Sequence, residues 1–324
     1  MGQTERDLAG SRSLTASDRE LMSVFLEKPG FLLARIDQIC TAIFSGLSET
    51  VTLNQAEFLL LLDRLGSMIQ INLARAAGVD KSTTAFILDN LQNRGWIERT
   101  VNQDDRRSSF VSLTASGAAL VPEVRRDFEQ LQHVLQSPVE PARLLHLIPM
   151  LHRLGSNPEG LAPRWQTACD PASGVLDRSL SFLTRRTLQL LNAQFLAVMG
   201  DTKLTLRQFS LLFILSRRQR ITQIEFARIF GVDPATCAVI MRGPLRRGLI
   251  ASAPSPQDGR ARVYRLTKTG RGYLEAVHPR VDRVEAAAFR HETAEDCRGM
   301  VNDLRAIVKA HSHSLRFPGA IDSR

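Results

Sequence analysis

Four short segments carry side chains that could bind an anionic or hydrogen-bonding partner. Asp80 to Thr84 (DKSTT) and Asp233 to Cys237 (DPATC) each begin with aspartate, a favoured helix N-cap, and continue into a predicted first helical turn. Asp105 to Arg107 (DRR) and Asp258 to Arg260 (DGR) each place an arginine two residues after an aspartate. Arginine, lysine and hydroxyl groups donate hydrogen bonds to phosphates and other acceptors. The sequence has no nucleophile motif, glycine-rich phosphate loop or metal-ligand cluster, so we expect recognition rather than catalysis.

These segments belong to an internal repeat. Identical residues recur 153 positions apart, and no gap is needed from Thr52/Thr205 to Gly117/Gly270. The helical pattern from Phe31 to Phe44 recurs from Phe182 to Phe195 at an offset of 151. The other matched pairs include Gln70/Gln223, Ala74/Ala227, Gly78/Gly231, Asp80/Asp233, Thr83/Thr236, Arg94/Arg247, Asp105/Asp258, Arg107/Arg260 and Thr114/Thr267. Such a period is the size of a domain, so the chain is predicted to be a tandem duplication.

Within each copy, the hydrophobic pattern predicts a short helix, a turn containing glycine and a second helix, followed by two strands. Copy 1 is expected to have helices at 31–44, 54–65, 70–77, 81–93, 118–135 and 141–154, and strands at 96–101 and 110–113. The polar segment 102–109 joins the strands as the tip of a wing. Copy 2 repeats this order and ends with a helix at 294–310. A helix from about Ser17 precedes copy 1.

The second helix of copy 2 contains Gly243 and Pro244, where copy 1 has Asn90 and Leu91. A proline inside a helix removes one backbone hydrogen bond and costs ~3 kcal/mol. We therefore expect this helix to be short or kinked.

The composition is that of a globular protein with two domains, at 324 residues, 44% hydrophobic and 23% charged. No apolar run approaches the ~20 residues of a membrane span. The N-terminus lacks the apolar core of a signal peptide, so we expect a cytoplasmic protein. Cys40, Cys169, Cys237 and Cys297 are too scattered to indicate a zinc site or a disulfide framework, and no cofactor or metal is expected.

The net charge of +9 is distributed unevenly. Residues 1–160 carry 16 Lys and Arg against 19 Asp and Glu, whereas residues 161–324 carry 26 against 14. The two halves therefore have net charges of −3 and +12. A basic protein suggests a polyanionic partner, although a merely soluble basic surface would give the same count.

Each copy resembles a MarR-family transcriptional regulator. The resemblance rests on the helix-turn-helix followed by R-G-(W/L)-I, then D-x-R in the wing, then L-T-x-x-G. The start of copy 1, from Pro29 to Ile39, further resembles a branch of that family linked to aromatic-acid catabolism. The resemblance implies a mainly α fold with small β wings, two winged helix-turn-helix domains and interlocked N- and C-terminal helices. Because the family forms homodimers and one chain here supplies two copies, we expect an intrachain pseudo-dimer, with further dimerisation left open.

The expected domain order follows from the two copies. We expect a lead-in at 1–28, a first winged-helix domain at 29–154, a linker at 155–177, a second winged-helix domain at 178–314 and a tail at 315–324.

The resemblance also implies double-stranded DNA as the partner, with the second helix in the major groove and the wing arginine in or near the minor groove. The residues expected to contact DNA are Lys81, Ser82, Thr83, Thr84, Arg106, Arg107, Thr236, Arg242, Arg260 and Arg262, with Asp105 and Asp258 orienting the wing tips. Helix capping by the hydroxyls and ordinary exposed Asp–Arg salt bridges are the structural alternatives. We expect copy 1 to supply most base readout and copy 2 more phosphate attraction.

An effector pocket is a further implication of the resemblance. Its candidates are Arg35, Gln38, Arg186 and Gln189, because arginine can hold a carboxylate bidentately, as in an aromatic acid or its CoA thioester. The two arginines could equally form interhelix salt bridges or face solvent. The expected function is a ligand-responsive transcriptional regulator, more specifically a repressor. The alternatives are an interaction module in which copy 2 has lost specific DNA binding, or a redox sensor acting through a cysteine such as Cys40.

Overall fold

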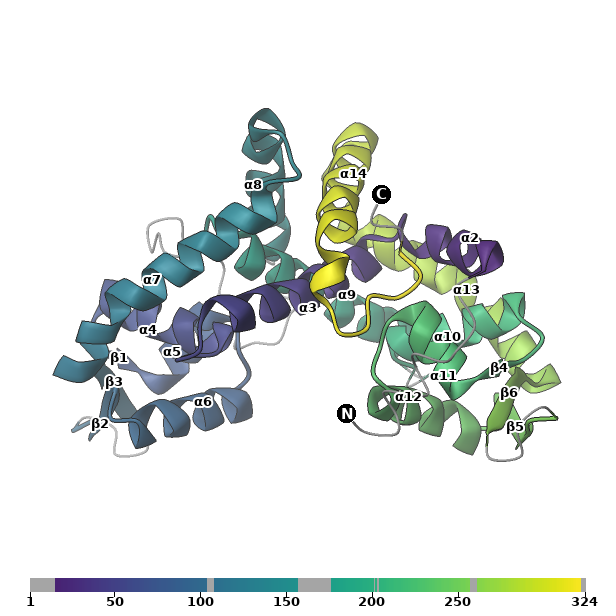
Figure 1. The fold of residues 1–324 in the computed structure, drawn as a ribbon, viewed down its shortest axis with the longest axis horizontal. Coiled ribbons are helices and arrows are strands. Elements are labelled where there is room, and N and C mark those ends of the chain that lie inside the picture. Colours follow the sequence, from purple (N-terminus) through teal and green to yellow (C-terminus); the bar gives the residue numbers. More distant parts are fainter. Residues whose placement is uncertain are drawn as a thin grey trace. The chain divides into compact units, whose positions relative to one another are not determined.

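The computed structural model describes residues 15–103, 108–156, 176–200, 202, 204–256 and 261–321. These residues are mainly helical and include two three-stranded antiparallel sheets (Figure 1). They divide into two compact units that do not follow the two sequence copies. The first unit contains the described parts of 33–193 and 298–307, and the second contains those of 1–32, 194–297 and 308–324.

Copy 1 forms a winged helix in the first of these units. Its elements are α4 (Leu53–Leu65), β1 (Met68–Ile69), α5 (Gln70–Ala77), α6 (Lys81–Asn93), β2 (Ile97–Val101) and β3 (Ser109–Leu113). The strands are ordered β1-β3-β2, with Met68 opposite Val111 and Ile97 opposite Leu113. The helices pack over this sheet through a core of fully or almost fully buried side chains, namely Phe58, Leu59, Leu73, Ala74, Leu88, Leu91 and Val111.

The same unit contains long helices from both copies. They are α7 (Ala115–Gln136), α8 (Pro141–Gly155), most of α3 (Pro29–Leu47) and of α9 (Leu180–Met199), and a middle part of α14 (Ala294–His311). Helix α7 packs on α4 through residues at helical spacing, among them Val124, Phe128 and Leu131. Helix α9 belongs to copy 2, so the winged helix of copy 1 shares its unit with a helix of the other copy.

Copy 2 forms the second winged helix. Its elements are α10 (Leu206–Arg217), β4 (Ile221–Thr222), α11 (Gln223–Phe230), α12 (Pro234–Arg246), β5 (Ile250–Pro254), β6 (Arg262–Leu266) and α13 (Lys268–Ala288). The strand order β4-β6-β5 is that of copy 1. Helix α2 (Ala16–Phe25), from the start of the chain, belongs to this unit, as does the short helix η1 (Ser312–Ser314).

The second helix of copy 2 is not shortened, contrary to the expectation from its sequence. Helix α12 has 13 residues, as α6 does, and continues through Pro244. The proline lies only two residues before the helix ends, and it is buried at the position that Leu91 occupies in copy 1. Gly243 allows the close approach of Gln208, whose Nε2 would lie 2.5 Å from an added Cβ. Tertiary packing therefore offsets the one hydrogen bond that the proline removes.

Helix α3 is the one described helix whose length and composition would allow it to cross a membrane. Its side chains Leu32, Leu33, Ile36, Ile39 and Phe44 are all fully buried within the protein. This burial is typical of a core helix.

Candidate nucleic-acid interface

A glycine turn and an aspartate cap precede the second helix of each helix-turn-helix. Gly78 and Gly231 follow α5 and α11 with φ of 61° and 70°, in the left-handed region that glycine adopts at little steric cost. Asp80 and Asp233 then cap α6 and α12 by accepting hydrogen bonds from backbone N–H groups of the first turn. The turn and the cap together set the direction in which each second helix leaves the first.

The hydroxyl groups at the start of α6 take part in this cap. Ser82 Oγ donates to Asp80 at 2.5 Å and Thr83 Oγ1 donates to it at 2.6 Å, alongside the two backbone N–H bonds at 3.0 and 2.9 Å. Hydrogen bonds from these side chains lower the pKa of Asp80 to about 2. The hydroxyl protons are therefore used within the protein, and the oxygens remain able to accept. Lys81 is exposed beside them.

Thr84 does not lie on the surface, so its predicted contact with DNA does not fit the structure. Its side chain is fully buried, and Oγ1 lies 3.5 Å from the carbonyl oxygen of Val79. Cys237, the equivalent residue in copy 2, is also fully buried. Position four of each second helix points into the core because it lies one turn beyond the cap, on the apolar face.

The second helix of copy 2 has the same cap but a different charge. Thr236 donates to Asp233 through both its backbone N–H and its hydroxyl. Arg242 is exposed on α12, whereas the equivalent residue on α6 is Asp89, which forms an ion pair with Arg99 at 2.7 Å. The charge at this helix position is therefore reversed between the copies.

The structure describes the strands of both wings but not the residues at their tips. Arg262 is exposed on β6, where its guanidinium donates to Ser252 Oγ at 2.8 and 3.2 Å. The tip residues predicted to contact DNA or orient the wing lie outside the described residues; these are Asp105, Arg106, Arg107, Asp258 and Arg260. Their roles therefore remain predictions.

The sequence reasoning missed one exposed pair. Phe86 on α6 is 70% exposed, and Val239, its equivalent on α12, is 62% exposed. Two apolar side chains thus occupy the same outward position on both second helices. The signal was present in copy 1, because Phe86 interrupts the otherwise polar outer face of α6, whereas Val239 lies beside the exposed Ala235 and Ala238 on α12.

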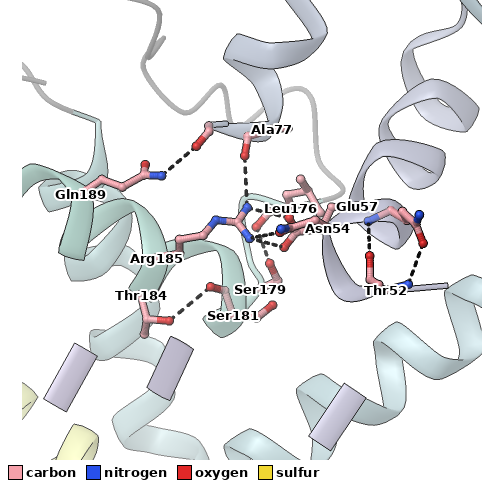
Figure 2. Close-up of polar contacts among 12 residues, drawn as sticks. Thr52, Asn54, Glu57, Ala77, Leu176, Ser179, Ser181, Thr184, Arg185 and Gln189 are labelled. Atoms are coloured by element: carbon pink, nitrogen blue, oxygen red, sulfur yellow. Dashed lines mark hydrogen bonds and ion pairs between the residues drawn. The ribbon is translucent and has the colours of Figure 1, made fainter. Parts of the chain in front are cut away.

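Side chains from a helix of copy 2 donate hydrogen bonds to the turn of the copy 1 helix-turn-helix (Figure 2). Arg185 Nη2 donates to the carbonyl oxygen of Ala77 at 3.1 Å, and Gln189 Nε2 donates to that of Gly78 at 2.8 Å. Both side chains come from α9. They satisfy carbonyl groups at the C-terminus of α5, where the helix leaves such acceptors without an internal partner.

The four residues expected to bind an effector take part in hydrogen bonds within the protein. Arg35 Nη1 donates to Gln38 Oε1 at 2.9 Å, and Arg186 Nη2 lies 3.4 Å from a carbonyl oxygen at the end of α8. Gln189 bonds to the turn before α6, as described above. Arg35 and Arg186 are both buried. Their predicted role in effector binding stays a prediction.

None of these four lines a hollow that lies in the first unit. This hollow of about 770 Å³ lies between α4, α7 and the residues before α9. It is lined by Leu60, Asp63, Arg64, Arg125, Phe128, Glu129, Gln132, His133, Gln136, Arg178 and Ser179. Asp63 and Arg125 form an ion pair at 2.7 Å, and Gln132 donates to Ser181 at 2.9 Å.

Comparison with known proteins agrees with this architecture. The model of the MarR family matches residues 51–109 and again residues 204–261. Over 97 residues the chain is 35% identical to the HTH-type transcriptional repressor NicR of Pseudomonas putida, a match that covers 29% of this chain and 61% of NicR. It is 28% identical over 122 residues to the HTH-type transcriptional regulator PecS of Dickeya dadantii, covering 37% of this chain and 72% of PecS.

One solved structure is similar to part of the chain. This structure is of Bordetella bronchiseptica BpsR and was described for the regulation of its DNA binding by 6-hydroxynicotinic acid. The two sequences are 26% identical, the match covers 39% of this chain and 91% of BpsR, and the TM-score is 0.37.

The fold defines a protein with two winged helix-turn-helix domains. Since the family model matches both copies at equivalent positions, the chain is a tandem duplication of a MarR-family domain.

Proposed function

We propose that this protein is a transcriptional regulator that binds double-stranded DNA, with α6 and α12 as its recognition helices. The observation that carries the proposal is that both copies keep the left-handed glycine, the aspartate cap and an exposed outer helix face next to a wing. A helix presented in this way fits the major groove of DNA. We also propose that the protein acts as a repressor and that it is located in the cytoplasm.

The direct test is footprinting on the DNA upstream of the protein's own gene, followed by affinity measurements with the protected fragment and with random DNA. We expect a protected site and tighter binding to it than to random DNA. Equal affinity for both at every salt concentration would contradict sequence-specific regulation.

We further propose that the two copies act as a single-chain pseudo-dimer. The supporting observation is that each winged helix packs with a segment of the other copy in its own unit. Helix α9 of copy 2 contacts α4 and α5 of copy 1. Phe25, which precedes copy 1, and Phe31 at its start contact Phe230 of copy 2, at centroid distances of 5.5 and 5.6 Å.

The two recognition helices divide their work in this proposal. Copy 1 supplies most base readout through Lys81, Ser82 and Thr83, and copy 2 supplies phosphate attraction through Arg242 and the wing arginines. If Arg260→Ala relaxed sequence preference while Lys81→Ala weakened binding to all DNA equally, this division would be wrong.

A small anionic effector, such as an aromatic acid or its CoA thioester, is proposed to regulate binding. The hollow beside α7 supports it, because its volume suits such a ligand and its lining includes Arg64 and Arg178, besides Arg125, which is paired with Asp63, and Glu129. A thermal-shift screen of aromatic acids and their CoA thioesters tests the proposal, with Arg178→Ala and Arg35→Ala as variants. Loss of the shift in Arg178→Ala alone would assign the hollow, loss in Arg35→Ala alone would assign the buried arginine, and the absence of any shift would exclude this effector class.

The two alternatives have less support. A redox sensor needs a reactive thiolate, yet burial raises the pKa of Cys40 well above its usual value and raises that of Cys237 to about 12. An interaction module without DNA binding in copy 2 would not need the exposed Arg242 on a fully formed α12. Mutation of the copy 2 wing residues separates this interaction module from the proposed regulator, because only the regulator should lose affinity for DNA.

A further inference from the structure

A buried ion pair joins the two copies. Arg185 on α9 approaches Glu57 on α4 with Nη2 2.6 Å from Oε2 and Nη1 3.1 Å from Oε1, a bidentate geometry (Figure 2). Arg185 also donates to Asn54 Oδ1 at 3.2 Å and to the carbonyl of Ala77 at 3.1 Å. The Glu57 side chain is fully buried and that of Arg185 is 12% exposed. Copy 2 thus supplies the cation and copy 1 the anion.

Neither charge is repeated in the other half of the duplication. At the offset of 151 that relates the first helices, Arg185 corresponds to Ala34. At the offset of 153 that relates the winged helices, Glu57 corresponds to Ser210. The mirror-image contact of a symmetric dimer would therefore bring together two small, uncharged side chains.

The winged helix of copy 2 is contacted by different chemistry. The Asp18 carboxylate on α2 forms ion pairs with Arg218 and Arg228. Phe25 packs edge-on against Phe213 at 5.7 Å. Where copy 2 has Phe213, Arg218 and Phe230, copy 1 has Leu60, Leu65 and Ala77. Each winged helix is therefore shaped for a different segment.

We propose that the copy 1 winged helix is a docking surface selective for the first helix of copy 2, with Glu57 and Arg185 as the discriminating pair. The chain consequently closes on itself, and pairing of like copies between two chains is rejected. This proposal rests on the single-chain pseudo-dimer proposed above.

The selectivity follows from the cost of an isolated buried charge. Pairing of copy 1 with copy 1 places Glu57 against Ala34, so the carboxylate loses its cation while it stays buried. Pairing of copy 2 with copy 2 places Arg185 against Ser210, with the same result for the guanidinium. Removing one partner of a buried pair is far more destabilising than removing both. Specificity against a wrong partner commonly uses such an unpaired charge.

Charge exchange between two full-length chains tests the proposal. A Glu57→Arg chain has two cations at the site, and an Arg185→Glu chain has two anions. When they are co-expressed, the cation introduced in the first variant can meet the anion introduced in the second. The native Arg185 of the first variant can then meet the native Glu57 of the second. We expect a one-to-one complex with twice the mass of one chain, formed by exchange of the copies between chains.

The variants alone and the double variant complete the test. We expect each single variant to have a thermal midpoint lowered by roughly 10 °C. The Glu57→Arg/Arg185→Glu chain should regain most of that loss and remain a monomer. The matched control is the exposed pair Asp63 and Arg125, both within copy 1. Co-expression of Asp63→Arg and Arg125→Asp chains should give monomers only.

The proposal is overturned if co-expression of the Glu57 and Arg185 single variants yields only monomers, or if both keep the wild-type thermal midpoint. It is also overturned if the double variant recovers nothing. A wild-type protein that is itself a dimer of chains would contradict the single-chain pseudo-dimer, and a monomer that fails to bind DNA would contradict the regulator. The mass and the DNA affinity of the wild type thus separate the three failures.

Discussion

At the residue scale, the start of α6 combines a structural cap with the surface that we propose for DNA recognition. Asp80 accepts four hydrogen bonds from Ser82 and Thr83, and these bonds orient both hydroxyl groups before any partner arrives. Side chains held in place lose less conformational entropy on binding. The cap contributes fully to stability and to this orientation only while its carboxylate is charged, which makes both sensitive to pH.

We predict that Asp80→Ala lowers the free energy of unfolding by about 1 kcal/mol at neutral pH. The pKa of Asp80 is lowered to about 2 in the folded protein, so the cap contributes fully above pH ~4 and loses its contribution as the pH falls from about 4 to about 2. Urea unfolding across this range measures the difference from wild type. Asp80→Asn is the control, because asparagine caps without a titrating group; if its difference from wild type showed no dependence on pH, the charged cap would be excluded.

Phe86 is the residue for which the surface suggests the most specific contact. It is 70% exposed on the outer face of α6, and in the major groove the apolar group available to it is the methyl group of thymine. Val239 offers the same contact with less surface from α12.

We predict that Phe86→Ala weakens binding to the footprinted site about fourfold, the equivalent of burying one methyl group at about 0.8 kcal/mol. Replacing each thymine of the site by uracil in turn removes one methyl group at a time. At the thymine that Phe86 contacts, uracil should weaken the wild type and leave Phe86→Ala unaffected. Additive losses at every thymine would show that Phe86 does not read a methyl group.

At the element scale, the L-T-x-x-G motif joins each wing to the helix that follows it. Thr267 caps α13 by accepting from the backbone N–H of Gly270 at 2.9 Å, and its hydroxyl donates to the carbonyl oxygen of Gly248 at 2.7 Å. Gly270 lies so close to the start of the wing that an added Cβ would be 2.0 Å from the carbonyl oxygen of Leu249. In copy 1, a Cβ at Gly117 would be 1.9 Å from that of Trp96. The glycine is required by close approach of two backbones.

We predict that Gly270→Ala destabilises the protein by at least about 1–3 kcal/mol, because the neighbouring atom is backbone and cannot move aside cheaply. Gly272→Ala is a matched control two residues further along α13, where the added Cβ would have no atom within 4 Å beyond its chain neighbours and the adjacent backbone of its own helix. It should stabilise the protein by up to ~1 kcal/mol, because alanine favours the helix. Chemical unfolding measures both, and equal effects would show that the close approach is unimportant.

At the scale of the whole molecule, the two halves of the sequence have opposite net charge, −3 for 1–160 and +12 for 161–324. The two proposed recognition helices follow this division, since Asp89 on α6 is replaced by Arg242 on α12. A chain with one neutral and one basic recognition helix should bind DNA with two unequal contacts. Phosphate contacts release counterions from DNA, so their number can be measured from the dependence of the affinity on salt concentration.

We predict that Arg242→Ala weakens binding to all DNA and reduces the slope of log affinity against log salt by about 1. The control is Arg283→Ala, an exposed arginine fifteen residues along α13 and thus about 22 Å from the start of that helix. It should leave the slope unchanged. A wild-type slope in Arg242→Ala would remove α12 from the phosphate contacts.

The sequence by itself determined the local architecture of both copies. The expected helices 70–77 and 81–93 match α5 and α6 at both ends. Their boundaries depend on short-range signals, namely a left-handed glycine and an aspartate cap, which act within a few residues. The two-residue strand β1 was missed because so short a segment has no periodicity. Helix α12 was expected to be short or kinked because the lost hydrogen bond of Pro244 can be read from the local sequence. The burial of Pro244, which accompanies the full length of α12, depends on the tertiary structure.

Only the tertiary structure decided which segments meet. A hydrophobic pattern shows that one face of a helix is buried, but not against what. The sequence therefore did not show that Thr84 lies inside and Phe86 outside, nor that Glu57 is buried against Arg185, 128 residues away. The repeat predicted two copies of one fold with unequal charges and DNA contacts, and the long-range contacts add a further difference between the copies. The physical reason for the contact between Glu57 and Arg185 is that a buried charge is stable only beside an opposite charge, which here comes from the other copy.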